Sequence, residues 1–316
     1  MAGKTISEAE RMRMITRRRD RFRTFYPLHL MVLPAVVFAI IFSYLPMYGI
    51  VIAFQRYNIT KSIFENQNWV GLRNFEYIFN NHDFWRALRN SFTIAIMKVT
   101  TGIIVPVTFS LLLNEVRSSK FKKSIQTAIY LPHFLSWIVL SSILITVLSP
   151  SRGFINMFIT ALGFKPIFFL GDAKWFQFTL VVTELWKEFG WGTIVYLAAI
   201  SAVSPELYEA ALMDGANKFQ QMRYVTLPGI SHIIVLMTVL ALGRVLNAGF
   251  DQVFNLYSPL VYETGDILET LVYRVGLTQS NFHVSTAIGL FKSVVALALI
   301  GVSYYIADKT TGYRVF

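Results

Sequence analysis

Charged residues interrupt several long apolar stretches of this chain. A charge facing lipid is costly, so such residues usually face a cavity or a partner. We therefore expect these residues to line a polar path for a solute. The positively charged side chains among them would suit an anionic solute. The candidates are Lys98, Glu184, Lys187, Arg244 and Lys292, together with Asn247, one helical turn beyond Arg244.

A structural explanation of the same charges stays open. Glu184 and Lys187 are three residues apart and would form a local ion pair on one helix. Lys98 and Lys292 would then reach the membrane surface or pair with a second subunit.

The sequence offers no chemistry for catalysis or for binding ATP. It lacks a G-x-x-x-x-G-K-[ST] phosphate loop, and its one Gly-Lys pair is Gly3-Lys4 at the terminus. There is no cysteine, and the five histidines have no metal-ligand spacing. We predict a protein that is not an enzyme and that binds no cofactor or metal. Two alternatives have other requirements. A secondary transporter would ordinarily show internal repeats, and an enzyme acting on lipid-linked sugars would need an acid/base cluster.

The composition is that of an integral membrane protein. Hydrophobic residues make up 54% of the 316 residues and charged residues only 15%. The net charge of +11 is carried mainly by Lys and Arg beside apolar runs, so it reports membrane topology rather than a nucleic-acid partner.

Apolar runs of about 20 residues or more, long enough for a hydrocarbon core of ~30 Å, predict an all-α protein with six transmembrane helices. Sixteen Lys and Arg fall in segments that this topology places in the cytoplasm and nine in segments outside, which puts both termini in the cytoplasm. We expect a basic N-terminal arm at 1–27, a six-span domain at 28–309 and a tail at 310–316. The expected spans are 28–54, 90–115, 124–148, 175–203, 229–250 and 284–307.

The polar segment 204–228 lies between two of these spans. Ser204 is a suitable N-cap and Pro205 suits the first helical turn, so a helix is expected to begin here. Gly215 suits the left-handed turn that ends it, and a second short helix should run from Asn217 to about Val225. We expect two helices joined at a glycine.

This segment resembles the cytoplasmic EAA loop of permease subunits of binding-protein-dependent ABC importers. The resemblance lies in Glu209-Ala210-Ala211, Gly215 and Val225-Thr226-Leu227-Pro228, where only Val225 departs from the usual Ile. It implies a type I ABC importer permease fold in a bacterial cytoplasmic (inner) membrane. The residues that would couple this loop to the ATPase are Glu206, Glu209, Ala210, Ala211, Asp214, Gly215, Leu227 and Pro228.

Two further stretches, YLPHFLSW at 130–137 and LVYRVGL at 271–277, resemble the oligosaccharide and polysaccharide branch of that family. The implied partners are a second homologous permease, an ABC ATPase dimer that holds ATP and Mg, and an extracytoplasmic solute-binding protein. The implied substrate is an oligo- or polysaccharide, with an acidic one such as alginate suggested by the cations. A permease for another class of solute is the alternative.

Overall fold

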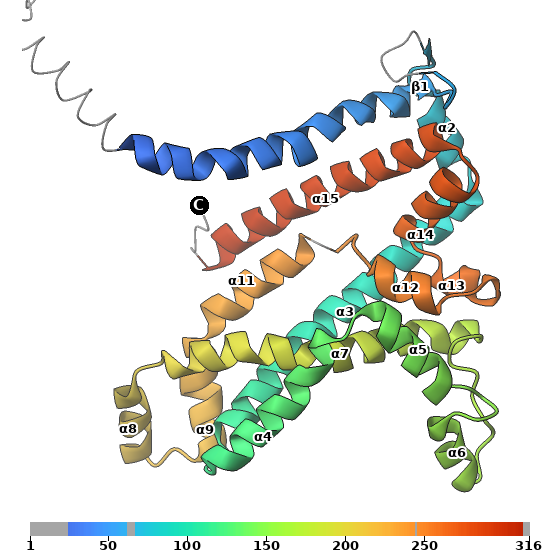
Figure 1. Ribbon diagram of the computed structural model, residues 1–316. Coiled ribbons are helices and arrows are strands. Elements are labelled where there is room, and N and C mark those ends of the chain that lie inside the picture. The colour runs from blue at the N-terminus through green and yellow to red at the C-terminus, as the bar shows by residue number, and fades with distance from the viewer. Residues whose placement is uncertain (1–24, 62–66, 244, 312–316) are drawn as a thin grey trace, which may run out of the picture.

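The computed structural model describes residues 25–61, 67–243 and 245–311, which form an elongated, almost wholly helical molecule (Figure 1). Within these ranges the one sheet is the antiparallel pair of β1, Gln55–Arg56, and β2, Asn68–Trp69. The helices, in chain order, are Phe25–Phe54, with π and 3-10 turns in its second half, α2 Arg73–Phe79, α3 His82–Asn114, α4 Ser119–Tyr130, η3 Leu131–Phe134, α5 Trp137–Val147, α6 Phe154–Ala161, α7 Ala173–Ser201, α8 Pro205–Met213, α9 Lys218–Gln221, η4 Met222–Thr226, α10 Leu227–Gly229, α11 Ser231–Leu242, α12 Phe250–Leu256, η5 Pro259–Val261, α13 Tyr262–Gly265, α14 Leu268–Tyr273, η6 Arg274–Thr278 and α15 Phe282–Thr311.

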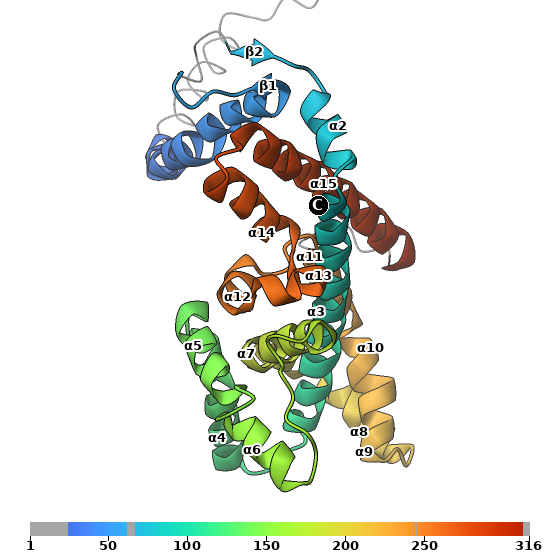
Figure 2. The same cartoon turned by 90° about the vertical axis from the view of Figure 1, so that its right-hand side faces the viewer.

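Helices α3 and α7 cross and pack together at the centre of the fold (Figures 1 and 2). Each begins at a side-chain cap: Asn81 accepts from the backbone N–H of Asp83, and Asp172 accepts from that of Lys174. Ile94 of α3 and Phe176 of α7 are fully buried in one core cluster with Val253 of α12. The two long helices are therefore the frame that positions the polar residues between them.

Three helices in the described ranges are long and apolar enough to cross a membrane: Phe25–Phe54, α3 and α15. The number rises to five if α4–η3 with α5, and α9–α10 with α11, each count as one bent span. The expected span 175–203 coincides with α7, which carries Glu184, Lys187 and Glu188 at its middle. The all-helical membrane fold is confirmed at this coarser level.

The expected span 124–148 is sharply bent. Its two helical parts, Ser119–Phe134 and Trp137–Val147, meet at 103°. Pro132 lies in the 3-10 turn η3 at the end of the first part, and the bend follows at Leu135 and Ser136, whose backbone is extended. Ser136 then starts α5 by accepting from the backbone N–H of Val139.

The expected span 229–250 is interrupted, which the apolar pattern did not predict. Helix α11 ends at Leu242, and the described residues 243 and 245–249 are not helical before α12 begins at Phe250. Gly249 has a φ of +95°, and a Cβ built on it would lie 2.8 Å from Lys98 Nζ. The left-handed backbone favours glycine here, and a larger residue would also displace the end of the Lys98 side chain. We call residues 245–249 the break segment.

Two segments expected to be outside loops also contain helices. Residues 149–174 include α6, and residues 251–283 include α12, α13, α14 and two short turns of helix. Helices satisfy their backbone hydrogen bonds internally, which suits α12, α13 and α14 because they pack against α3 or α7.

Candidate functional site

The polar segment that follows α7 begins with α8 and turns at Gly215. Pro205 lies in the first helical turn as predicted, but the Ser204 side chain makes no capping hydrogen bond. Its backbone carbonyl accepts from the N–H of Leu207 at 3.2 Å instead. Gly215 has a φ of +79°, and a Cβ there would meet nothing within 4 Å. The left-handed backbone, and not crowding, therefore calls for glycine at this turn.

The second half of the segment starts at Asn217, whose side chain accepts from the backbone N–H of Gln220 while Gln220 Oε1 accepts from that of Asn217. The helix does not end near Val225 as expected. It passes through the π turn η4 into α10 and then bends by 59° into α11. Pro228 has no N–H for an ordinary helical bond, and a wider π turn before it accommodates that loss.

Two side-chain contacts hold this region, residues 204–229, which we call the elbow. The hydroxyls of Tyr208 and Thr226 are 2.9 Å apart and join α8 to η4. Lys218 Nζ lies 3.4 Å from Glu115 Oε2, just beyond the end of α3. The elbow is thus attached to α3 as well as to α11.

The elbow exposes both apolar and acidic side chains. Met213 is 88% exposed, Phe219 67% and Leu212 66%. A large exposed apolar surface beside carboxylates is typical of a protein–protein contact. Of the residues expected to couple, Ala211 and Leu227 are half-buried, and those that are exposed are Glu206, Glu209, Ala210, Asp214, Gly215 and Pro228.

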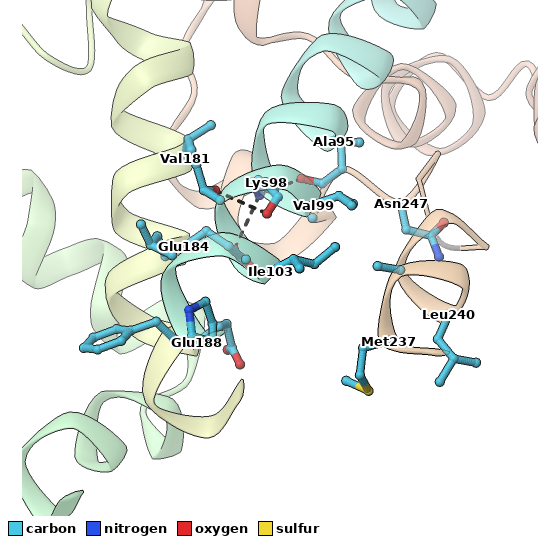
Figure 3. A pocket seen from close by; sticks show the side chains of 18 of the residues that line it. Ala95, Lys98, Val99, Ile103, Val181, Glu184, Glu188, Met237, Leu240 and Asn247 are labelled. Atoms are coloured by element: carbon cyan, nitrogen blue, oxygen red, sulfur yellow. Dashed lines mark hydrogen bonds and ion pairs between the residues drawn. The ribbon is translucent and has the colours of Figure 1, made fainter. Parts of the chain in front are cut away.

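Lys98 lies at the centre of a buried polar network between α3, α7 and the break segment (Figure 3). Its Nζ donates to the backbone carbonyl of Ala248 at 2.7 Å and to Gln252 Oε1, and it lies 3.4 Å from Glu184 Oε2. Gln252 Nε2 in turn donates to the carbonyl of Leu180 and to Thr183 Oγ1, both at 2.8 Å. One lysine therefore fixes the break segment to both long helices.

Lys187 belongs to a different cluster, so the local pair of Glu184 with Lys187 does not form. Lys187 Nζ is 2.7 Å from Glu188 Oε1 and donates to the carbonyl of His133 at 3.0 Å. The His133 ring is hydrogen-bonded to Glu188 Oε2 at 2.8 Å and stacks on Trp191. Glu184 faces α3 instead, because Lys98 reaches it from there.

Two cavities adjoin the break segment. The first, of about 440 Å³, lies between α3, α7 and α11 and is lined in part by Lys98, Glu184, Glu188 and Asn247. We call it the Lys98 cavity; in Figure 3 Glu184 and Asn247 lie on opposite sides of Lys98. The second, of about 720 Å³, lies between the start of α12, α14 and α15. We call it the Lys292 cavity, and its lysine is 2.7 Å from Glu269 Oε1.

The structure thus brings together most of the expected path residues. Lys98, Glu184 and Asn247 line the first cavity, Lys292 lines the second, and Asn247 borders both. Lys187 is buried and lines neither. Arg244 lies outside the described residues, and Asn247 is in the break segment rather than on a helical face.

Sequence reasoning missed several partners of these lysines. Glu188 was visible as a carboxylate next to Lys187 in an apolar span. Gln252 and Glu269 lie in a segment interpreted as loop, and their proximity to Lys98 and Lys292 depends on folding. Among the described residues, no group of three or more His, Asp or Glu is placed to hold a metal ion.

Comparisons with known proteins bear on the whole chain. The family described as "Binding-protein-dependent transport system inner membrane component" matches residues 106–313. "Protein LplB" of Bacillus subtilis (strain 168) is 42% identical over 308 residues, which are 98% of this chain and 93% of that protein. The "Polygalacturonan/rhamnogalacturonan transport system permease protein YteP" of the same strain is 42% identical, over 89% of this chain and 88% of that one.

A solved structure agrees with this match. A chain from the crystal structure of "a bacterial ABC transporter involved in the import of the acidic polysaccharide alginate" superposes with a TM-score of 0.86 and 35% identity. The match covers 93% of this chain and 99% of that one. The chain belongs to the family of binding-protein-dependent transport system inner membrane components. It is a permease subunit of an ABC importer, in which a partner ATPase hydrolyses ATP.

Proposed function

We propose that this chain forms one half of the membrane passage of an ATP-driven importer of oligo- or polysaccharides. The elbow would dock on the ATPase, and the two cavities would form this chain's part of the passage. A second homologous permease would form the other half, and a solute-binding protein would deliver the saccharide from outside.

One observation carries this proposal: consecutive helices, bent by 59° between α10 and α11, lead from the elbow toward the Lys98 cavity. The elbow continues through α10 into α11, whose 12 residues lead to the break segment. The break segment lines the cavity and is held by Lys98. A displacement of the elbow would therefore be transmitted along α11 to the wall of the cavity, since a short helix moves as a rigid body.

Non-helical backbone at membrane depth is tolerated only where it is buried in protein or lines a cavity. The break segment meets that condition, because Val245, Leu246 and Ala248 are buried and Asn247 borders both cavities. It is therefore suited to a moving part of a solute passage and not to a lipid-facing surface.

Six spans remain the topology that we propose, with 1–27 and 310–316 in the cytoplasm and the elbow on the same side. Helix α7 has 29 residues and would be about 43 Å long at 1.5 Å per residue, enough to cross a core of ~30 Å. Its central charges are paired, Glu184 with Lys98 and Lys187 with Glu188, which makes a position within the membrane tolerable.

Impermeant thiol labelling tests this topology, because the chain contains no natural cysteine. Single cysteines at Asn68 and Glu263 should react from outside intact cells, whereas cysteines at Ser119 and Asn217 should be shielded. These positions are exposed, so differences in labelling would report sidedness. Reaction of the Asn217 position from outside would overturn the six-span arrangement.

The saccharide assignment is supported by relatives and by the lining of the cavities. The relatives include a permease for polygalacturonan and rhamnogalacturonan and an importer of the acidic polysaccharide alginate. In this chain Lys98, Lys187 and Lys292 each have a carboxylate neighbour, so they present no uncompensated positive field. We propose that an acidic saccharide binds by exchanging with such a carboxylate as the partner of a lysine.

The direct test is ATP hydrolysis by the assembled transporter in vesicles, with ATP and Mg bound by the ATPase subunits. With the binding protein present, acidic oligosaccharides should stimulate hydrolysis and enter the vesicles. Amino acids and phosphate serve as controls. Stimulation by these, without any response to saccharides, would assign the chain to another class of solute.

A further inference from the structure

We propose that the Lys292 cavity is a second saccharide-binding site, specific for a pyranose unit that carries a carboxylate. This inference rests on the proposed function and extends it, because it assigns the ligand to residues around Glu269 and Tyr273. The cavity of about 720 Å³ falls within the range of ~300–1,000 Å³ that is typical of ligand sites.

The polar side of this cavity has an unfilled hydrogen-bonding position. Lys292 Nζ bonds Glu269 Oε1, but Glu269 Oε2 is buried and has no hydrogen-bond partner. A buried carboxylate oxygen without a donor is unfavourable, and such atoms call for an explanation. A sugar carboxylate would accept from Lys292 in a charge-assisted hydrogen bond, and a turn of the Glu269 side chain into the cavity would let a sugar hydroxyl donate to Oε2.

The apolar side offers aromatic surface. Tyr273 and Phe250 both line the cavity, and their ring centroids are 5.8 Å apart. A pyranose ring has an apolar C–H face that can pack on such rings while its hydroxyls bond the polar groups opposite. Phe282 and the hydroxyl-bearing Ser285 and Ser293 complete this mixed lining.

The aromatic wall is held rigidly from behind. Asp266 is fully buried and binds Arg274 through both carboxylate oxygens, with Nη1 to Oδ1 at 2.9 Å. Burial opposes the charge of Arg274, but the hydrogen bonds and the charge of Asp266 prevail and raise its pKa. Arg274 follows Tyr273 directly, so this ion pair fixes the end of α14 where the ring projects.

Gly289 keeps the cavity open on the α15 side. It lines the cavity, and a Cβ built on it would meet no atom within 4 Å. A larger side chain would therefore enter the space without a backbone clash. Gly102 has the same property in the Lys98 cavity, and Gly301 has it on α15 away from both cavities.

Because Asn247 borders both cavities, a longer saccharide would occupy both cavities together, and a short saccharide would need only one of them.

The experiment compares Gly289→Leu with Gly301→Leu and Gly102→Leu in the complete transporter. Uptake of oligogalacturonides, from the dimer to the hexamer, is measured in vesicles with the binding protein present. Gly289→Leu should reduce uptake of the hexamer about tenfold, because it removes one good contact with the saccharide. Uptake of the dimer should not change. Gly102→Leu should impair every length, and Gly301→Leu none.

The outcomes separate this inference from the proposed function. If the unaltered transporter takes up saccharides and Gly289→Leu matches Gly301→Leu at every length, the second site is wrong. If Gly289→Leu alone prevents assembly, the cavity is a packing surface for another subunit and the inference is again wrong. No saccharide response in the unaltered transporter would instead contradict the proposed function.

Glu269→Gln provides a second test with a result of opposite sign. Loss of the competing carboxylate should leave the Lys292 ammonium free to bind the carboxylate of the sugar. Half-maximal uptake of an acidic hexamer should then need about fivefold less substrate, because a partly exposed ion pair contributes a free energy of that size. A neutral malto-oligosaccharide of equal length is the control for general effects. Weaker uptake of the acidic hexamer, or an equal change for both saccharides, would contradict the site.

Discussion

The elbow and the Lys98 network are built by opposite means. In the elbow the bonds that set the turn are local: Asn217 and Gln220 are three residues apart, and Tyr208 and Thr226 are 18 apart. Lys98 instead bonds groups that are 86, 150 and 154 residues away in sequence. The elbow exposes its side chains, whereas the Lys98 side chain is only 11% exposed.

This contrast explains what each region can do. A locally determined and exposed surface keeps its shape while it moves, which suits docking on a partner. A buried network that joins distant segments has its bonds made or broken when those segments shift, which suits a wall that must change with the transport cycle.

The buried pair should tolerate the loss of both partners better than the loss of one. Glu184→Gln leaves Lys98 without its carboxylate, and breaking such a buried pair typically costs about 3–5 kcal/mol. The double variant Lys98→Met with Glu184→Met removes the unpaired charge but leaves the Ala248 carbonyl without its donor, so it should recover only part of the unfolding temperature of the purified transporter and none of its transport. A double variant less stable than Glu184→Gln would contradict this account of the pair.

The turn of the elbow should depend on backbone conformation alone. Gly215→Val places a β-branched residue at a φ of +79° and should cost ~1–2 kcal/mol locally. We expect it to uncouple ATP hydrolysis from uptake while the transporter still assembles. Gly215→Asn is the matched control, since Asn tolerates left-handed backbone. Unchanged coupling in the valine variant would remove Gly215 from the mechanism.

The hydroxyl contact between α8 and η4 should have a smaller effect. Tyr208→Phe removes the bond to Thr226 and should cost about 1 kcal/mol. We expect a partial loss of saccharide-stimulated ATP hydrolysis, because the elbow then transmits displacement less faithfully. Tyr224→Phe, at a largely exposed position, is the control. Equal effects of the two changes would show that the Tyr208 contact is not specific.

The exposed pair of Lys218 with Glu115 should matter least. Lys218 is 68% exposed, and exposed ion pairs contribute ~0–1 kcal/mol. Lys218→Ala should therefore shift the unfolding temperature far less than Glu184→Gln in the same assay. A comparable shift would show that the attachment of the elbow to α3 is as important as the buried network.

The class of this protein could be predicted from its amino-acid sequence alone. Long apolar runs fixed a helical membrane fold, and the spacing of Glu209-Ala210-Ala211, Gly215 and Leu227-Pro228 identified the permease family, which the comparisons confirm. Gly215 acts through its own backbone preference, so the left-handed turn there followed from local chemistry. The six-span topology and the coupling roles stay predictions.

The pairing of the charges and the interruption of the fifth expected span depend on packing between distant segments. Spacing along one helix suggested Glu184 with Lys187, yet Lys98 takes Glu184 and Glu188 takes Lys187. The apolar pattern gave no sign that 245–249 leaves the helix, because that backbone is stabilised by the Lys98 bond to the carbonyl of Ala248. Such bonds join residues far apart in sequence, and they exist only once α3, α7 and α11 have packed.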